Sequence, residues 1–268
     1  MKALKLTSML SYICIMSTFK DHFSGHASEY KKYRPQYPQE LFGFLSSICP
    51  QHESAWDVGT GNGQAAVALT NYFEYVLATD ASHNQVAGAM PHERVDYKVS
   101  PAEKCPIEQE KFDLVTVAQA AHWFDLDPFY CEVRSVAKNN AVLAIWTYGL
   151  FSVNEQVDEI VNAFYHDVVG PYWPPERRHV EQGYSDLEFP FEIIESPKFT
   201  TSLNYTLDQL LGYVETWSAV KNYKIQIKVN PIQQLRAPLA EVWGPADKVN
   251  LISWPIALKV GRVIHSME

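Results

Sequence analysis

Three glycines at alternate positions, Gly59, Gly61 and Gly63, separate an apolar segment from a stretch with helical character. Glycine allows a tight backbone turn and leaves no side chain between the backbone and a ligand. Residues 54–58 before the turn are expected to form a short buried strand, and a helix is expected to begin at Gln64. This order of elements is typical of nucleotide-binding proteins. A turn without any ligand has the same pattern, so the glycines alone do not establish a function.

Strand-like and helical segments alternate from Pro38 to Tyr148. The segment 112–118 is apolar almost throughout, as a central strand of a parallel sheet is. The alternation predicts an α/β fold with a doubly wound parallel sheet. The expected strands are residues 54–58, 74–79, 95–99, 112–118 and 141–148, and the expected helices begin at Pro38, Gln64, Ser82 and Pro128.

The alternation stops between Gly149 and Pro190. A helical stretch, 155–169, leads there into residues 170–179, which are rich in proline and aromatic side chains. This region is too long for an ordinary connection between a strand and a helix. We therefore expect residues 149–190 to form a small helical insert that caps the site. Beyond it, strands are expected at 191–200 and 249–260, and helices at a capping box of Thr206 and Gln209 and at 235–243.

Composition limits the classes of partner. The 268 residues fit one domain with an insertion or two small domains. The net charge of −9 comes without the run of Lys or Arg that a nucleic-acid binder would show. No apolar run reaches the roughly 18 residues of a membrane span. The four cysteines are far apart, which indicates no metal site and no disulfide framework and favours a cytoplasmic protein. A small molecule is the favoured partner, and the oligomeric state stays open.

Acidic residues near the glycines bear on the cofactor. Counted from Gly61, the glycine spacing ends at Ala66 and is followed by Asp80, which satisfies a nicotinamide-binding fingerprint. Spacing therefore leaves NAD open. Asp57 favours another ligand, because a carboxylate two residues before the first glycine would repel a pyrophosphate. It suits a ligand that carries an ammonium group and a sulfonium cation.

Asp57 to Gly63, with Asp80 at the end of the next strand, resembles the first two motifs of Rossmann-like (class I) S-adenosylmethionine-dependent methyltransferases. The resemblance extends to the methyltransferase type 11 branch that includes trans-aconitate methyltransferase-like proteins. It implies a seven-stranded, mostly parallel sheet with an antiparallel last strand. It also implies one domain over 19–262, between a loosely ordered leader (1–18) and a tail (263–268). The segments that carry the branch resemblance are Asp21–Ala27, Tyr30, Tyr33–Pro38, Ala102–Glu103, Gln119–Phe124, Thr216–Ser218 and Trp254–Pro255.

The resemblance implies a binding site for S-adenosylmethionine. Asp57 and the backbone of Gly59 and Gly61 would hold the methionine part. Asp80 would accept hydrogen bonds from both ribose hydroxyls, since a carboxylate is only an acceptor. The other implied contacts are Ala81, Ala102 and Glu103 at the adenine, Gln119 beside the sulfonium, and Tyr30 and Arg34 in a segment over the cofactor. For Glu103 and Arg34, an ordinary loop acid and a structural ion pair remain equally good interpretations.

His122 and Trp123 are the candidate catalytic residues. They follow the expected strand 112–118, at the edge of the sheet where α/β proteins bind ligands. His122 would act as a general base or bind an anionic substrate, and Trp123 would pack beside the methyl donor. A purely structural role is open for both, because methyl transfer often needs no base.

Aromatic residues are the candidates for binding the acceptor. Trp146, Tyr148, Tyr172, Trp173 and Trp217 would line its pocket, although core packing explains most of them equally well. Arg177, Arg178 and His179 would recognise an anionic acceptor or form a solvated basic patch, and the patch is the favoured interpretation.

The sequence thus predicts a methyltransferase that acts on a small molecule, with a carboxylic acid as a candidate acceptor. The acceptor atom would displace S-adenosylhomocysteine in line, so the protein's main task is to position the reactants and exclude water. Two alternatives remain at this point: an NAD(P)-dependent oxidoreductase and a non-catalytic protein that binds S-adenosylmethionine.

Overall fold

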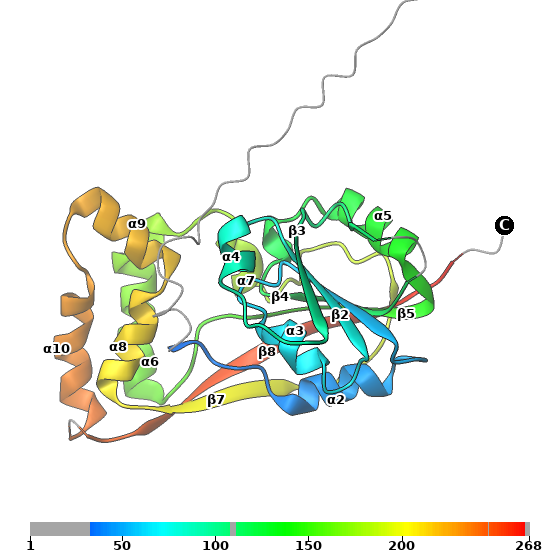
Figure 1. Ribbon diagram of the computed structural model, residues 1–268. Helices are drawn as coiled ribbons and strands as arrows, with labels where there is room; N and C mark the ends of the chain where they lie inside the picture. Colours follow the sequence, from blue (N-terminus) through cyan, green and yellow to red (C-terminus); the bar gives the residue numbers. More distant parts are fainter. Residues whose placement is uncertain (1–32, 108–110, 246, 266–268) are drawn as a thin grey trace, which may run out of the picture.

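The computed structural model describes residues 33–107, 111–245 and 247–265 (Figure 1). A mixed sheet with the strand order β3-β2-β1-β4-β5-β8-β6 forms its centre, and β7 pairs with β8 outside this path. Within the described part of the chain the strands are β1 (Ser54–Val58), β2 (Tyr75–Asp80), β3 (Val95–Val99), β4 (Phe112–Ala118), β5 (Ala137–Tyr148), β6 (Glu192–Ile193), β7 (Phe199–Tyr205) and β8 (Asn250–Val263).

The first five strands run parallel and meet at one edge. In the register, Trp56 of β1 lies beside Leu77 of β2 and Val115 of β4. The carboxyl ends of β1, β2 and β4 are therefore side by side, at the edge where such sheets bind ligands. β1 is buried along its whole length, and its two polar residues, Ser54 and Asp57, are buried with the apolar ones.

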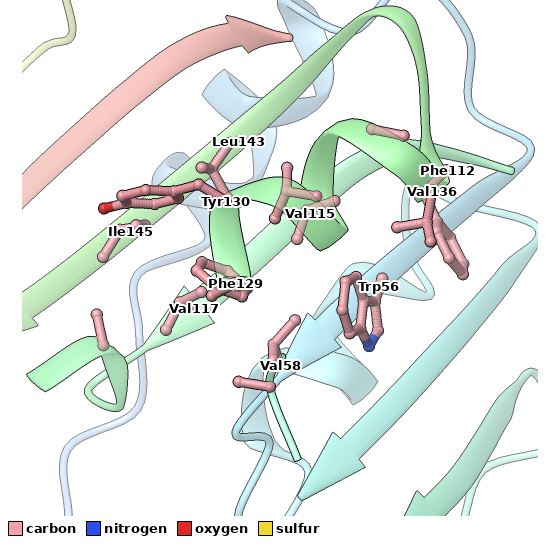
Figure 2. Close-up of a cluster of buried hydrophobic side chains, with 14 of the residues drawn as sticks. Trp56, Val58, Phe112, Val115, Val117, Phe129, Tyr130, Val136, Leu143 and Ile145 are labelled. Carbon is pink, nitrogen blue, oxygen red and sulfur yellow. The ribbon is translucent and has the colours of Figure 1, made fainter. Parts of the chain in front are cut away.

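Helices cover both faces of the sheet. On one face, α5 (Leu126–Val136) packs Phe129 and Val133 against Trp56 and Val115, as Figure 2 shows for most of these side chains. On the other face, α2 (Gln39–Ser47) and α3 (Gln64–Leu69) cover β1, β2 and β5. The short α4 (His83–Ala87) follows β2 and is capped by Ser82, as expected. The doubly wound α/β architecture is confirmed.

The strand count differs from the expected seven. The expected strand over residues 191–200 is two strands, β6 and β7, with Pro197 between them. Proline lacks the N–H that a strand interior must donate, so the pairing breaks there. β8 is antiparallel, as predicted, but it is long enough to pair with β5 in its second half and with β7 in its first half.

A helical layer lies beside the sheet and comes from two parts of the chain (Figure 1). The first part is α6 (Glu155–Ala163), which continues as a π-helical turn, η2 (Phe164–Val168), and a 3-10 turn, η3 (Gly170–Tyr172). The second part is α8 (Leu207–Glu215), α9 (Ser218–Ile227) and α10 (Ile232–Trp243). α10 packs against both α6 and α8. The helical layer therefore includes more of the chain than the segment 149–190, and a role of that segment as a cap over the site stays a prediction.

The capping box of α8 is confirmed, and α9 is an element that sequence reasoning missed. Thr206 and Gln209 exchange side-chain and backbone hydrogen bonds at the start of α8. In α9 only Ala219 and Val220 are buried, so the helix leaves no apolar periodicity in the sequence. No helix of the described residues is long and apolar enough to cross a membrane.

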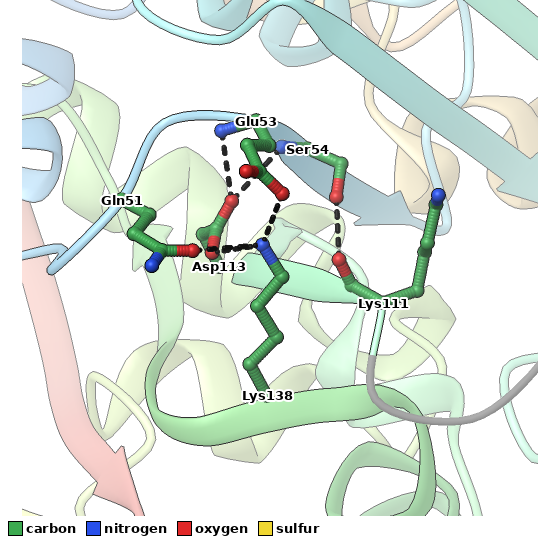
Figure 3. Close-up of polar contacts among 6 residues, drawn as sticks. All are labelled: Gln51, Glu53, Ser54, Lys111, Asp113 and Lys138. Atoms are coloured by element: carbon green, nitrogen blue, oxygen red, sulfur yellow. Dashed lines mark hydrogen bonds and ion pairs between the residues drawn. The ribbon is translucent and has the colours of Figure 1, made fainter.

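A buried ion pair fixes the amino-terminal edge of the sheet (Figure 3). The Asp113 side chain, 2% exposed, accepts hydrogen bonds from the backbone N–H groups of Glu53 (2.9 Å) and Ser54 (3.0 Å). Lys138 Nζ lies 2.8 Å from the Asp113 carboxylate and 2.7 Å from that of Glu53. These contacts join β1, β4 and β5 at the end opposite the ligand edge.

Replacing Asp113 tests this network. Asp113→Ala leaves two backbone N–H groups without their acceptor and removes the buried partner of the Lys138 ammonium, and we expect a loss of about 2–4 kcal/mol in the free energy of unfolding by urea denaturation. The control is Arg236→Ala, which breaks an exposed pair with Asp208 and should cost less than about 1 kcal/mol. Equal losses in the two variants would contradict the structural role of Asp113.

Candidate active site

The glycine turn after β1 has one position that faces open space. All three glycines have positive φ angles, with Gly61 at +56°. A Cβ atom on Gly59 would lie 2.6 Å from the Cβ of Ala120, and one on Gly63 would overlap the Tyr97 hydroxyl. A Cβ on Gly61 would meet nothing within 4 Å. Packing requires the first and third glycines, while the backbone at Gly61 is available to a ligand.

Asp57 is fully buried and holds this turn in place. Its Oδ2 accepts the Thr60 hydroxyl at 2.6 Å, and its Oδ1 accepts the Thr116 hydroxyl of β4 at 2.8 Å. Burial raises the pKa of Asp57 to about 6, against the effect of these bonds and of the Ala66 backbone N–H, and the charge of Asp80 adds to the rise. Asp57 thus contacts the turn, β4 and α3 directly. Its contact with the methionine part stays a prediction.

Asp80 ends β2 beside the same turn. Its Oδ2 accepts the backbone N–H of Gly61 at 2.9 Å, and its Oδ1 accepts that of Ser82 at 2.8 Å. The side chain is half-buried, and each carboxylate oxygen can accept a further hydrogen bond. Two fixed acceptors next to the open backbone of Gly61 fit a ribose with its vicinal hydroxyls. The residues present therefore fit the cofactor that the resemblance implies.

The adenine candidates lie in less specific surroundings. Glu103 Oε1 accepts the backbone N–H of Asp125 at 3.0 Å, so this acid has a structural partner at the start of α5. Ala102 is buried in the core cluster that includes Val58, and Ala81 follows Asp80 in a half-buried position. Tyr30 lies outside the described residues. The adenine contacts remain predictions.

Gln119 follows β4 and has a φ angle of +58°, which is uncommon for a residue other than glycine. Its Nε2 donates to the carbonyl of Tyr148 at 3.1 Å, and its Oε1 accepts the Thr147 hydroxyl. Such backbone strain is typical of functional sites and persists only where neighbouring bonds hold it. The ends of β4 and β5 are joined here by a side chain.

A cleft of about 870 Å³, partly open to solvent, lies between this edge of the sheet and the helical layer. It brings together seven of the predicted site residues and several that were not predicted. The predicted ones are Arg34, Gln119, His122, Trp123, Tyr148, Trp173 and Trp217. The residues that sequence reasoning missed are Tyr213, Thr216, Ser218 and Lys221, which come from α8, α9 and the turn between them. Their only sequence signal is the Thr216–Ser218 motif.

Two predicted acceptor contacts do not line the cleft. Trp146 is fully buried against Tyr37 and Phe42 on the face of the sheet that α2 covers. Tyr172 packs its ring on Tyr223, and its carbonyl accepts a hydrogen bond from Asn222. Tyr148 is on the same face of β5 as Trp146, but it is the last residue of the strand and lines the cleft, as predicted.

The cleft carries positive charge. Arg34, Arg177 and Lys221 line it, and none of the described lining residues is acidic. The Arg177 guanidinium lies over the Trp173 ring, 4.6 Å from its centroid, and its Nε donates to the Tyr165 hydroxyl at 2.8 Å. These contacts hold the guanidinium in one orientation.

The favoured interpretation of residues 177–179 as a solvated basic patch is wrong for Arg177. Arg178, the next residue, does not line the cleft. His179 forms an ion pair with Asp186 at 2.7 Å, in a part-buried position. The three basic residues therefore have three different environments on the short helix α7 (Arg177–Glu181).

His122 lies in η1 (Ala121–Trp123), at the wall of the cleft. Its Nδ1 lies 2.7 Å from the hydroxyl oxygen of Tyr184, and its ring packs on Trp123 with centroids 4.8 Å apart. Burial lowers the pKa of His122 to about 3, and the positive charges of Arg177 and His179 contribute. The imidazole is therefore neutral at pH 7.

Comparisons with known proteins agree with this geometry. Residues 56–145 match the family model described as a methyltransferase domain. A Dictyostelium discoideum protein that carries the name of a methyltransferase is 35% identical over 95% of this chain and 99% of its own length. A Saccharomyces cerevisiae protein named as an S-adenosylmethionine-dependent methyltransferase is 26% identical over 72% of this chain and 78% of its own.

A solved structure is similar over most of the chain. The protein from Anaeromyxobacter dehalogenans, which carries the name of a type II methyltransferase, superposes with a TM-score of 0.83 at 40% sequence identity. The match covers 87% of this chain and all of that protein's chain. It therefore includes the helical layer as well as the sheet.

Replacing Asp80 tests the ribose site. Asp80→Ala should weaken the binding of S-adenosylmethionine at least roughly 100-fold by calorimetry, since two hydroxyl groups lose charged acceptors and Gly61 loses its fixed position. The control is Asp96→Ala, which removes an acid from the neighbouring strand β3 and should leave the affinity unchanged. Unchanged affinity in Asp80→Ala would show that the ribose binds elsewhere.

The low pKa of His122 predicts a pH-dependent stability. Between pH 6.5, its ordinary value, and about 3, the unfolded chain binds a proton at His122 that the folded chain excludes, so the stability falls as the pH falls. His122→Gln lacks this effect. From pH 7 to 5 the wild type should lose roughly 1–2 kcal/mol relative to His122→Gln in urea denaturation. A constant difference would contradict the depressed pKa.

Proposed function

Because the chain belongs to the Rossmann-like (class I) S-adenosylmethionine-dependent methyltransferases, we propose that it methylates a carboxylate of a small molecule bound in the cationic cleft. The chain is an enzyme with S-adenosylmethionine as its cofactor. The alternatives of an NAD(P)-dependent oxidoreductase and of a non-catalytic binding protein do not hold.

The charge of the cleft carries the proposal. Arg34, Arg177 and Lys221 come from three separate parts of the chain, yet they line one cleft in a protein whose net charge is −9. Among the described lining residues no carboxylate offsets them. Such a site favours an anionic acceptor over an amine, which would enter as a cation. The oriented guanidinium of Arg177 matches the two oxygens of a carboxylate.

A carboxylate acceptor also agrees with the residues that the cleft lacks. A carboxylic acid is ionised at pH 7 and needs no base to become a nucleophile. His122 is neutral, and its pKa of about 3 makes it a poor base. S-adenosylmethionine supplies a methyl group that is already activated on a sulfonium. The protein's own residues then have to orient the acceptor and exclude water.

The aromatic walls serve both tasks. Trp217 packs against Trp173 and Phe151 at centroid distances of 5.7 and 6.3 Å, within the core of the helical layer. Trp173 in turn carries Arg177 on its ring. An apolar or unsaturated body would pack on these rings while its carboxylate reaches Arg177. We propose a small carboxylic acid with such a body, and a cytoplasmic location in keeping with the widely spaced cysteines.

Labelled methyl donor and a panel of small carboxylic acids, amines and phenols test the acceptor class. A methyl ester releases its label as methanol in mild base, whereas methylated amines and phenols keep it. We expect base-labile product from one or more acids. Transfer only to amines or phenols would contradict the proposal.

The neighbouring arginines offer a matched pair of variants. Arg177→Gln should raise the KM for the acid about 10–100-fold, because a charge-assisted hydrogen bond in a shielded site is worth roughly 1.5–3 kcal/mol. Arg178→Gln changes the net charge equally but lies outside the cleft, so its KM should match the wild type. Calorimetry with S-adenosylmethionine serves as the check that neither variant loses the cofactor. An equal rise in KM for both variants would show that the effect comes from long-range electrostatics and not from a direct contact of Arg177 with the acid.

A further inference from the structure

Tyr184 contacts His122 across 62 residues of sequence, and the chain adopts an uncommon conformation to place it there. Gly183 and Tyr184 have φ angles of +58° and +60°, just after α7. A positive φ is strained for a bulky residue such as tyrosine. The side chain is 1% exposed, deep in the core cluster of the sheet. Strain of this kind is typical of positions with a functional role.

The hydrogen-bond partners of Tyr184 decide the direction of its bond to His122. The phenol oxygen lies 2.7 Å from His122 Nδ1, and the backbone N–H groups of Ala121 and His122, which can only donate, lie near it. The phenol has one hydrogen, and this hydrogen needs an acceptor because the side chain is buried. If His122 Nδ1 carried a hydrogen, only N–H groups of these residues would face the phenol, and its own hydrogen would have no nitrogen acceptor. The arrangement that satisfies every group has the Tyr184 hydroxyl donating to an unprotonated Nδ1.

Thr147 is the other group near the phenol. Its hydroxyl hydrogen goes to Gln119 Oε1, because the Gln119 amide nitrogen is turned to the Tyr148 carbonyl. Thr147 and His122 Nδ1 are then both potential acceptors for the phenol hydrogen. An imidazole nitrogen is the more basic acceptor, and the contact to it, at 2.7 Å, has the length of a good O–H···N bond. Thr147 therefore does not change the direction.

A neutral imidazole without a hydrogen on Nδ1 carries it on Nε2. His122 lines the cleft, whereas Tyr184 does not, so the ring edge with Nδ1 faces the protein and the edge with Nε2 is left for the cleft. The positive charge of Arg177 near the ring opposes a second proton. The cleft therefore receives an uncharged N–H donor near the Arg177 guanidinium.

We propose that Tyr184 is a positioning residue that fixes His122 as the Nε2–H tautomer, so that His122 donates a hydrogen bond to the acceptor's carboxylate and is not a general base. The second half of this inference rests on the proposed function. A neutral donor orients an acceptor oxygen but draws away less of its negative charge than another cation would. That matters here, because the oxygen must remain nucleophilic.

Two-bond proton–nitrogen correlation spectra of the histidine-labelled enzyme test the tautomer without any acceptor. At pH 7 we expect the His122 ring to show an unprotonated Nδ1 and a protonated Nε2, with the signals assigned by their loss in His122→Gln. In Tyr184→Phe the fixed pattern should give way to a mixture of tautomers or to the reverse one. A protonated Nδ1 in the wild type, or a pattern unchanged in Tyr184→Phe, would overturn the inference.

Kinetics with an accepted acid test the role of the donor. Tyr184→Phe should raise the KM for the acid about 10-fold at an unchanged affinity for S-adenosylmethionine. The side-chain nitrogen of His122→Gln occupies nearly the place of Nε2 and donates without help from Tyr184, so this variant should retain most of the affinity, and adding Tyr184→Phe to it should change little. His122→Leu has no donor and should show the full rise. Equal effects of Tyr184→Phe in the wild type and in His122→Gln would make Tyr184 merely structural.

The two experiments separate this inference from the proposed function. If no acid is methylated but the spectra show the Nε2–H tautomer, Tyr184 still positions His122, but a carboxylate is not the group to which His122 donates. If acids are methylated but Nδ1 is protonated, the proposed function holds and this inference falls.

Discussion

The buried carboxylate of Asp57 is the interaction on which the site depends. It ties the glycine turn to β4 through Thr60 and Thr116, and to α3 through the Ala66 backbone. Asp80 then fixes Gly61 from the next strand. Two acids thus hold an open stretch of backbone, and both lie at the one edge where parallel strands end together. The sequence motif therefore makes the turn rigid, and its contact with the cofactor stays a prediction.

The cleft that we propose for the acceptor depends on different interactions. Its walls are aromatic rings of the helical layer, and its charge comes from arginine and lysine side chains, of which Arg177 is oriented by a ring and a hydroxyl. The cleft therefore combines shape from buried rings with a field from fixed cations. His122 adds an uncharged polar group to this set. These two kinds of site suit the proposed reaction. The activated donor needs a rigid site, whereas the acceptor must be oriented and shielded from water.

The elements predicted correctly from the sequence are those that follow a local residue pattern. The apolar run 112–118 is β4 as expected, and Thr206 with Gln209 begins α8. Features that depend on residues far apart in the sequence could not be predicted in this way. β8 pairs with β5 on one side and with β6 and β7 on the other, and nothing in its own residues indicates these partners. Arg177 and Arg178 are adjacent and chemically identical, and only the tertiary packing of Trp173 and Tyr165 selects the first.

The structure of a ternary complex would test the central claim most directly. The enzyme would be crystallised with S-adenosylhomocysteine and a carboxylic acid that it methylates. We expect the carboxylate oxygens within about 3 Å of Arg177 and of His122 Nε2, and the ribose hydroxyls at the same distance from Asp80. A carboxylate bound away from Arg177, with the acceptor atom still facing the donor sulfur, would contradict this claim.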